Sequence, residues 1–198
     1  MKKLMIFAVL AVFSASLFGQ GYAPGDEARD FRLKNVDESM VSLADFPDAK
    51  GFIVIFTTNH CPYAVAYEDR IIELDKKFKN QGYPVIAINP NDPEAYPADS
   101  FDNMKIRAHE KGFTFPYLFD ETQAVAKSYG ATRTPHVYLV AKDSERLVVK
   151  YIGAIDDNYQ DASEVKEKYV ANAIASLEAG EPVTPKETKA IGCSIKWK

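Results

Sequence analysis

The sequence predicts a three-layer α/β domain in which a central mixed β-sheet is flanked by helices. Two buried apolar segments, residues 52–56 and 85–88, are joined by an amphipathic helix and form a parallel β-α-β unit. Farther along, residues 136–140 and 147–152 flank a polar loop, which is typical of an antiparallel hairpin. Because both kinds of strand pair occur in one chain, the sheet is mixed and its faces need helices to cover them.

The first half of the domain follows from local patterns. Residues 26–50 are expected at an edge, with Phe31 and Leu33 alternating with polar neighbours. Residues 52–56 are apolar without a break, as in a strand covered on both faces. A helix follows and is ended by Asn80-Gln81-Gly82. Its apolar stripe consists of Ala64, Tyr67, Ile71, Leu74 and Phe78.

The second half is punctuated by capping residues and glycines. After a loop rich in Pro and Asp, residues 89–100, Ser100 is expected to cap a helix that Gly112 ends. Asp120 and Gln123 have capping-box spacing for a short helix closed by Gly130.

A last helix and an irregular tail complete the chain. The helix is expected to be capped by Asp161 or Ser163, and its apolar face consists of Val165, Tyr169, Ala173 and Leu177. The tail, residues 180–198, contains two prolines and shows no periodicity.

The N-terminus is typical of a signal peptide. Lys2 and Lys3 precede an apolar run, residues 4–18, that is short for a membrane span. An uncleaved anchor is the alternative. We therefore expect a signal peptide at 1–20, a domain at 21–180 and a C-terminal tail at 181–198. The mature protein is expected to be secreted or periplasmic, without stable membrane association once the signal is cleaved.

Composition narrows the function classes. Of 198 residues, 46% are hydrophobic and 26% charged, which suits one domain with a real core. The formal net charge is −4 and no basic cluster with interleaved aromatics occurs, so nucleic acid is not expected as a partner. We expect no cofactor.

Cys61 lies between a predicted strand and the start of the helix that follows it, directly before Pro62. Free N–H groups and the positive dipole end of a helix favour thiolate over thiol there. His60 can add positive charge when protonated, and the Thr58 hydroxyl lies three residues before the sulfur. We therefore predict a reactive cysteine. The alternative is a small buried cysteine that only packs.

Several blocks of sequence, in order along the chain, resemble the peroxiredoxin-like AhpC/TSA, or redoxin, branch of the thioredoxin superfamily. They are GDEARDFRL, TTNHCPYAVAYEDRI, AINPNDPEAYPADSF, FPYLFDETQAVAKSYGATRTPHVYLV, GAIDDN and GCSIKWK. The resemblance covers nearly all of the chain after the signal and implies a thioredoxin fold. It also implies that Thr134-Pro135 is the family's cis-proline, facing the active-site cysteine and shaping the substrate face. An ordinary trans turn is the alternative.

Two departures from the family pattern bear on mechanism. Thr58 stands where this branch usually has the first cysteine of Cys-x-x-Cys, so the dithiol cycle cannot run within the motif. Thr58 instead restores the Thr-x-x-Cys pattern of true peroxiredoxins, whose attacking cysteine matches Cys61. The arginine of those enzymes aligns with Pro135. Arg133 is a substitute or, alternatively, an exposed surface residue.

Cys193, the second of two cysteines, lies in the tail. It resolves a sulfenic acid on Cys61 or bridges to it, or it has a structural or intermolecular role. Ile195 and Trp197 suggest that the tail docks. A metal site from Cys61, His136 and Cys193 is a weak third interpretation, because copper chaperones of this fold need a cysteine pair in the loop; we expect no metal.

Taken together, these residues predict a secreted thioredoxin-fold thiol oxidoreductase with a single active-site cysteine, Cys61. Thr58 and His60 would activate it and Cys193 is the candidate resolver. Peroxide or a protein disulfide or thiol is the expected substrate, with an external thiol reductant. The alternative function is a non-catalytic binding module that has lost dithiol chemistry and holds a peptide beside the Thr-Pro loop.

Overall fold

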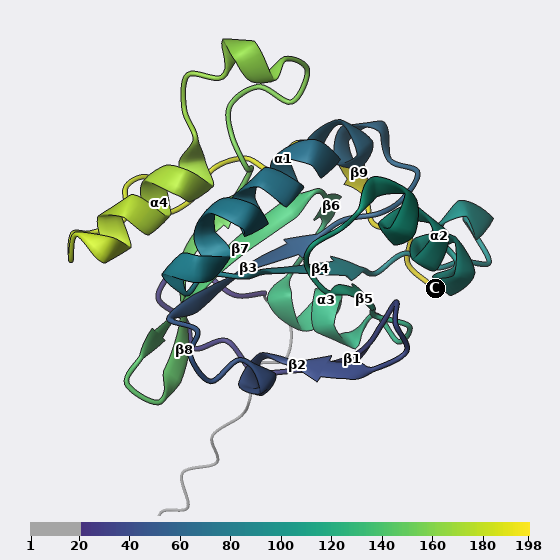
Figure 1. The fold of residues 1–198 in the computed structure, drawn as a ribbon, viewed down its shortest axis with the longest axis horizontal. Helices are drawn as coiled ribbons and strands as arrows, with labels where there is room; N and C mark the ends of the chain where they lie inside the picture. The colour runs from purple at the N-terminus through teal and green to yellow at the C-terminus, as the bar shows by residue number, and fades with distance from the viewer. Residues whose placement is uncertain (1–20) are drawn as a thin grey trace, which may run out of the picture.

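A seven-stranded mixed sheet, in the order β2-β1-β5-β4-β3-β7-β8, forms the centre of the molecule (Figure 1). The computed structural model describes residues 21–198, so the expected signal peptide lies outside the described residues. A second, two-stranded sheet pairs β6 with β9. The strands are β1 (Arg32–Asn35), β2 (Met40–Ser42), β3 (Gly51–Phe56), β4 (Val85–Asn89), β5 (Tyr117–Phe119), β6 (Arg133–Thr134), β7 (His136–Asp143), β8 (Arg146–Gly153) and β9 (Cys193–Ser194).

The predicted β-α-β unit and hairpin are both confirmed. β3 and β4 are parallel, with Ile53 opposite Val85, and β7 and β8 are antiparallel. β7 also pairs antiparallel with the other edge of β3, placing Phe56 opposite His136. All six residues of β3 are buried, as its unbroken apolar run predicts.

Within residues 21–198, four α-helices cover the two faces of the sheet (Figure 1). They are α1 (Pro62–Phe78), α2 (Phe101–Lys111), α3 (Ala124–Tyr129) and α4 (Tyr169–Glu178), with short 3-10 turns at Leu43–Asp45, Lys79–Gln81, Pro97–Asp99 and Ala162–Glu164. Because strand side chains alternate, Ile53 and Ile55 join a cluster with α1, α2 and α4, whereas Phe52, Val54 and Phe56 join one with α3. Each large apolar side chain buried this way contributes about 1.5–3 kcal/mol. The result is the thioredoxin-like, three-layer arrangement that the sequence predicts.

Helix ends follow the sequence signals in α1 and α2. Pro62 occupies the first helical position of α1, and Cys61 is its N-cap residue. The Ser100 hydroxyl accepts a hydrogen bond from Asn103 N, which caps α2, and Gly112 ends that helix at φ 63°.

Two expectations about local structure are wrong, and one strand was not predicted. The unpredicted strand is β5, which lies between β1 and β4. α4 begins at Tyr169, and Asp161 caps only a 3-10 turn, because Val165 is extended at ψ 122°. Gln123 forms no capping box: it adopts left-handed φ 61° and its side chain makes no cap hydrogen bond.

None of the helices within residues 21–198 has the length and apolar character needed to cross a membrane.

Candidate active site

Cys61 ends the loop between β3 and the N-terminus of α1. Its φ and ψ of −65° and 122° are extended, and its carbonyl oxygen accepts the first helical hydrogen bond from Val65 N at 2.9 Å. The residue is completely buried. The sequence prediction of a cysteine at a helix N-terminus is confirmed, and this position stabilises negative charge on sulfur when the thiol is free.

Cys193 is joined to Cys61 by a disulfide that closes 132 residues of chain, with the two Cα atoms 6.0 Å apart. The sequence left open whether the tail cysteine meets Cys61, and the structure brings the two together. Cys193 begins β9, beside β6 and one end of α1 (Figure 1). Cys193 is half-buried, whereas Cys61 is fully covered.

Thr134 and Pro135 face Cys61, as the resemblance implied. The peptide bond between them is cis. The carbonyl oxygen of Thr134 lies 3.1 Å from Cys61 Sγ, and Thr134 pairs with Cys193 in the small sheet. The Thr134 hydroxyl is buried and has no hydrogen-bond partner among the described residues.

Thr58 lies next to the cysteine through the main chain. Its hydroxyl accepts a hydrogen bond from Cys61 N at 3.4 Å, and the residue is buried. The hydroxyl of Thr58 therefore contacts the main chain of Cys61 directly before the first turn of α1.

His60 is held by a buried carboxylate that sequence reasoning missed. Its Nδ1 lies 2.5 Å from Oδ2 of Asp99, which is completely buried. Asp99 also accepts hydrogen bonds from Asn59 N at 2.8 Å and Asn91 Nδ2 at 2.7 Å. The His60 ring stacks on Tyr96 with centroids 4.4 Å apart. The signal in the sequence was the cluster of Asn and Asp after a strand's carboxyl end, a common place for functional polar groups.

The tail beyond Cys193 is bound to the rest of the fold through its main chain. Lys196 N donates to Asn91 Oδ1 at 2.9 Å, and Lys196 O accepts from Gln123 Nε2 at 2.7 Å and from Asp92 N at 3.0 Å. Ile195 is 4% exposed, so the prediction that the tail docks is confirmed, although Trp197 stays 42% exposed.

The remaining sequence candidates lie apart from the sulfurs. Arg133 is exposed, and within residues 21–198 no cationic side chain forms a hydrogen bond or ion pair with either cysteine. His136 is buried, and burial, with a smaller effect of Arg133, lowers its pKa to about 4. His109 is exposed. No three His, Cys, Asp or Glu side chains of the described chain gather in a way that would hold a metal ion.

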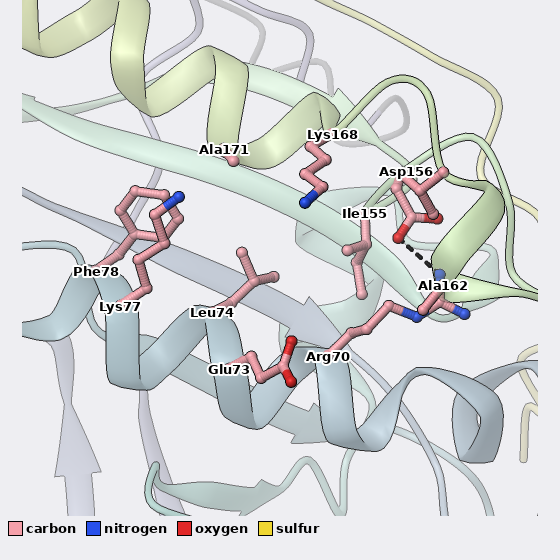
Figure 2. A pocket seen from close by; sticks show the side chains of 11 residues that line it. Arg70, Glu73, Leu74, Lys77, Phe78, Ile155, Asp156, Ala162, Lys168 and Ala171 are labelled. Atoms are coloured by element: carbon pink, nitrogen blue, oxygen red, sulfur yellow. Dashed lines mark hydrogen bonds and ion pairs between the residues drawn. The ribbon is translucent and has the colours of Figure 1, made fainter.

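A cavity of about 160 Å³ lies elsewhere, between the later turns of α1, the loop after β8 and α4 (Figure 2). The ion pair of Arg70 and Asp156, 2.7 Å long, lies at one end of it. Arg70 follows Cys61 by nine positions, roughly 14 Å along the helix axis. The residues that line this cavity include no cysteine or histidine, and both sulfurs of the disulfide lie outside it.

Comparisons with known proteins agree with this geometry. A crystal structure of an uncharacterised conserved protein from Geobacillus kaustophilus is 38% identical, covers 92% of this chain and 94% of its own, and superposes with a TM-score of 0.82. The thiol-disulfide oxidoreductase ResA of Halalkalibacterium halodurans is 24% identical over 81% of this chain and 93% of its own length. Peroxidoxin BcpB of Mycobacterium tuberculosis shares the fold, at 17% identity and a TM-score of 0.58, over 79% of this chain and 96% of its own.

The sequence profile of the AhpC/TSA family matches residues 24–158, a range that contains the thioredoxin-like sheet, Cys61 and the cis-proline. The chain therefore belongs to the AhpC/TSA family, within the group of thioredoxin-fold proteins.

Proposed function

We propose that this protein is a thiol oxidoreductase whose redox couple is Cys61 and Cys193, one cysteine from a helix N-terminus and one from the tail. The observation that carries the proposal is the disulfide between them. Thr58 occupies the position at which Cys-x-x-Cys proteins have the first cysteine of the motif, so the motif contains one thiol. A cysteine from the tail supplies the second thiol instead.

The oxidising half of the cycle begins at reduced Cys61. Its thiolate attacks one sulfur of a protein disulfide, forms a mixed disulfide and releases the other sulfur as a thiolate. Cys193 thiolate then attacks the Cys61 sulfur, forms the internal disulfide and releases the substrate as a second thiolate. Two electrons pass from the cysteine pair to the substrate.

Peroxide is a second candidate substrate, favoured by the Thr58 hydroxyl beside the cysteine. Cys61 thiolate then takes one peroxide oxygen and becomes a sulfenic acid, while the other oxygen leaves as water or alcohol after protonation. Cys193 thiol condenses with the sulfenic acid, releasing water and forming the same disulfide.

Return to the dithiol state needs an external thiol reductant. Cys193 is half-buried and Cys61 is fully buried, so an incoming thiolate reaches Cys193 first. Attack there releases Cys61 as thiolate at the helix N-terminus, where negative charge is stabilised and a good leaving group results. A second reductant thiol frees Cys193.

The test is intact-mass analysis of the reduced chain after one equivalent of a small protein disulfide or of hydrogen peroxide, quenched over time. The wild-type chain is expected to lose two hydrogen atoms. Cys193→Ser should accumulate a mixed disulfide or a sulfenic acid on Cys61, and Cys61→Ser should stay unmodified at that site.

The rate constants of Cys61 with the two oxidants identify the substrate class, because the physiological class is expected to react faster. If the Cys61 thiol titrates near 8.5, the ordinary value for cysteine, and reacts with either oxidant no faster than free cysteine does, the redox assignment is wrong. The non-catalytic binding module is then the better account.

We also propose that this chemistry takes place outside the cytoplasm. The signal-like segment, residues 1–20, and a bridge between two distant cysteines suit an oxidising environment. Detection of the processed chain outside the cytoplasm, with a new N-terminus near residue 21, is the corresponding measurement.

A further inference from the structure

We infer that the tail, residues 192–198, occupies a peptide-binding groove formed by β6, Asn91 and Gln123. We infer further that this groove binds an extended segment of a substrate protein with the pattern Gly-Cys-x-aliphatic. The inference rests on the proposed redox function and names its substrate class. The tail is the built-in occupant: residues 192–195 are Gly-Cys-Ser-Ile.

The groove contacts the main chain of its occupant at nearly every position. β6 pairs with β9, aligning Thr134 with Cys193, and Ile195 N donates to Thr132 O at 3.3 Å. Asn91 and Gln123 bind main-chain groups of Lys196, and Gln123 Oε1 accepts from Lys198 N at 2.9 Å. A site that contacts backbone can accept another chain in the same extended form, since every residue offers the same donor and acceptor.

Two positions select side chains. A Cβ built on Gly192 would lie 2.2 Å from the carbonyl oxygen of Thr134 and 3.1 Å from Pro135 N, so the position before the cysteine admits glycine alone without a backbone shift. Two positions after the cysteine, Ile195 is buried in the apolar cluster that contains Phe56 and Ala131. Ser194, between them, is exposed and selects nothing.

The groove has to be vacated for catalysis. Cys61 is completely buried while the tail is in place. A substrate sulfur reaches Cys61 only after the disulfide is reduced and the tail leaves. The tail then competes with the substrate for the groove, and its return brings Cys193 to the mixed disulfide to complete the exchange.

The experiment uses the full chain with Cys193→Ser, in which Cys61 is the remaining cysteine, and synthetic peptides. The parent peptide is Ile-Gly-Cys-Ser-Ile-Lys-Trp-Lys, with its cysteine in a disulfide to thionitrobenzoate. Cys61 thiolate bonds to the peptide sulfur, and the coloured thionitrobenzoate anion leaves. Three further peptides each carry one replacement. The glycine becomes alanine, the isoleucine two positions after the cysteine (the equivalent of Ile195) becomes asparagine, or the serine becomes alanine, and the last of these is the matched control.

We expect the parent and control peptides to react at equal, saturable rates. The alanine-for-glycine and asparagine-for-isoleucine peptides should be slower by about tenfold or more, the factor that corresponds to ~1.4 kcal/mol. Adding Ile195→Asn to the protein weakens the competing tail and should speed the parent peptide without changing its advantage over the alanine peptide. Rates within about twofold for all four peptides would overturn the inference.

Two further measurements separate the possible failures. A small disulfide of cysteamine and thionitrobenzoate reports Cys61 reactivity alone, so its failure to react counts against the proposed function. Fluorescent peptides with serine in place of cysteine report binding to the Cys193→Ser, Ile195→Asn chain without any reaction. Loss of the glycine preference in that assay counts against the groove itself.

Discussion

Nδ1 of His60 lies 2.5 Å from Oδ2 of Asp99, and the carboxylate of Asp99 has no exposed surface. His60 directly precedes the cysteine at the helix N-terminus. The same carboxylate oxygen accepts from Asn91, whose own oxygen binds the tail at Lys196 N. One buried carboxylate therefore connects the residue beside Cys61 with the segment that carries Cys193.

Asp99 is expected to act as a positioning residue for His60. Asp99→Asn replaces a charge-assisted hydrogen bond to His60 by a weaker neutral one, so the residue next to Cys61 is held less firmly. We expect the rate of Cys61 with a small disulfide to fall by about tenfold at pH 7, a change of ~1.4 kcal/mol in the barrier. The measurement is the pH profile of thiolate reactivity in the Cys193→Ser chain.

The matched control is Asp102→Asn, because Asp102 is 90% exposed at the side chain and lies in the first turn of α2. His60→Gln should also lower the rate, and combining it with Asp99→Asn should add little, since both act through one contact. Additive effects of the two changes would show that Asp99 acts on the loop structure independently of His60.

His136 is expected to make the fold sensitive to acid. Burial lowers its pKa from 6.5 to about 4. Above pH 6.5 the imidazole is neutral in both states and this group adds no pH dependence. As the pH falls from 6.5 to 4 the unfolded chain binds a proton that the folded chain does not, so the free energy of unfolding decreases by up to ~3 kcal/mol. Urea unfolding at a series of pH values measures the slope.

His136→Gln should flatten that part of the profile, because the glutamine side chain does not titrate. His109→Gln, on the exposed side of α2, should leave it unchanged and is the control. An equally steep profile in His136→Gln assigns the acid sensitivity to other groups.

Local sequence patterns predicted the helices and strands whose buried positions follow a regular pattern along consecutive residues. β3 is apolar throughout, and Cys61-Pro62 marks the start of α1. β5 was missed because three residues carry too little pattern, and its neighbours β1 and β4 are what make it a strand. Its buried Tyr117 owes its place to that pairing.

The parts of the site that were missed depend on contacts between distant residues. Asp99 is 39 positions from His60, and Gln123 is 73 from Lys196. The spacing of Asp120 and Gln123 favoured a cap, but the left-handed φ of Gln123 directs its amide to the tail instead. The sequence alone predicted the position of Cys61 at a helix N-terminus and identified Cys193 as its candidate partner. It contained no pattern that could predict the pairing of the two-residue strand β9 with Thr134.

Gln123 is expected to set the ease with which the disulfide is reduced. Asn adopts left-handed φ well and keeps the amide, but it is one methylene too short to reach both Lys196 O and Lys198 N. Gln123→Asn therefore weakens two hydrogen bonds that hold Cys193 near Cys61, each contributing about 1 kcal/mol. We expect the equilibrium constant for disulfide formation against glutathione to fall by roughly tenfold.

The control for this change is Gln81→Asn, since Gln81 is exposed and its side chain donates to Lys77 O, four residues earlier and away from the tail. The ratio of oxidised to reduced protein in glutathione buffers is read from trapped thiols by mass. An unchanged ratio in Gln123→Asn would mean that β9 pairing alone holds the tail.

Gly192 is expected to control how tightly the tail covers Cys61. In Gly192→Ala the new methyl group would meet the Thr134 carbonyl at 2.2 Å, so β9 has to move away from β6. Displacement exposes the Cys61–Cys193 bond, and we expect dithiothreitol to reduce it about tenfold faster than in the wild-type chain, a change of ~1.4 kcal/mol in the barrier. Ser194→Ala, at an exposed position of the same strand, should be reduced at the wild-type rate. Equal rates for all three chains would show that contact between Gly192 and Thr134 does not limit access to the sulfur.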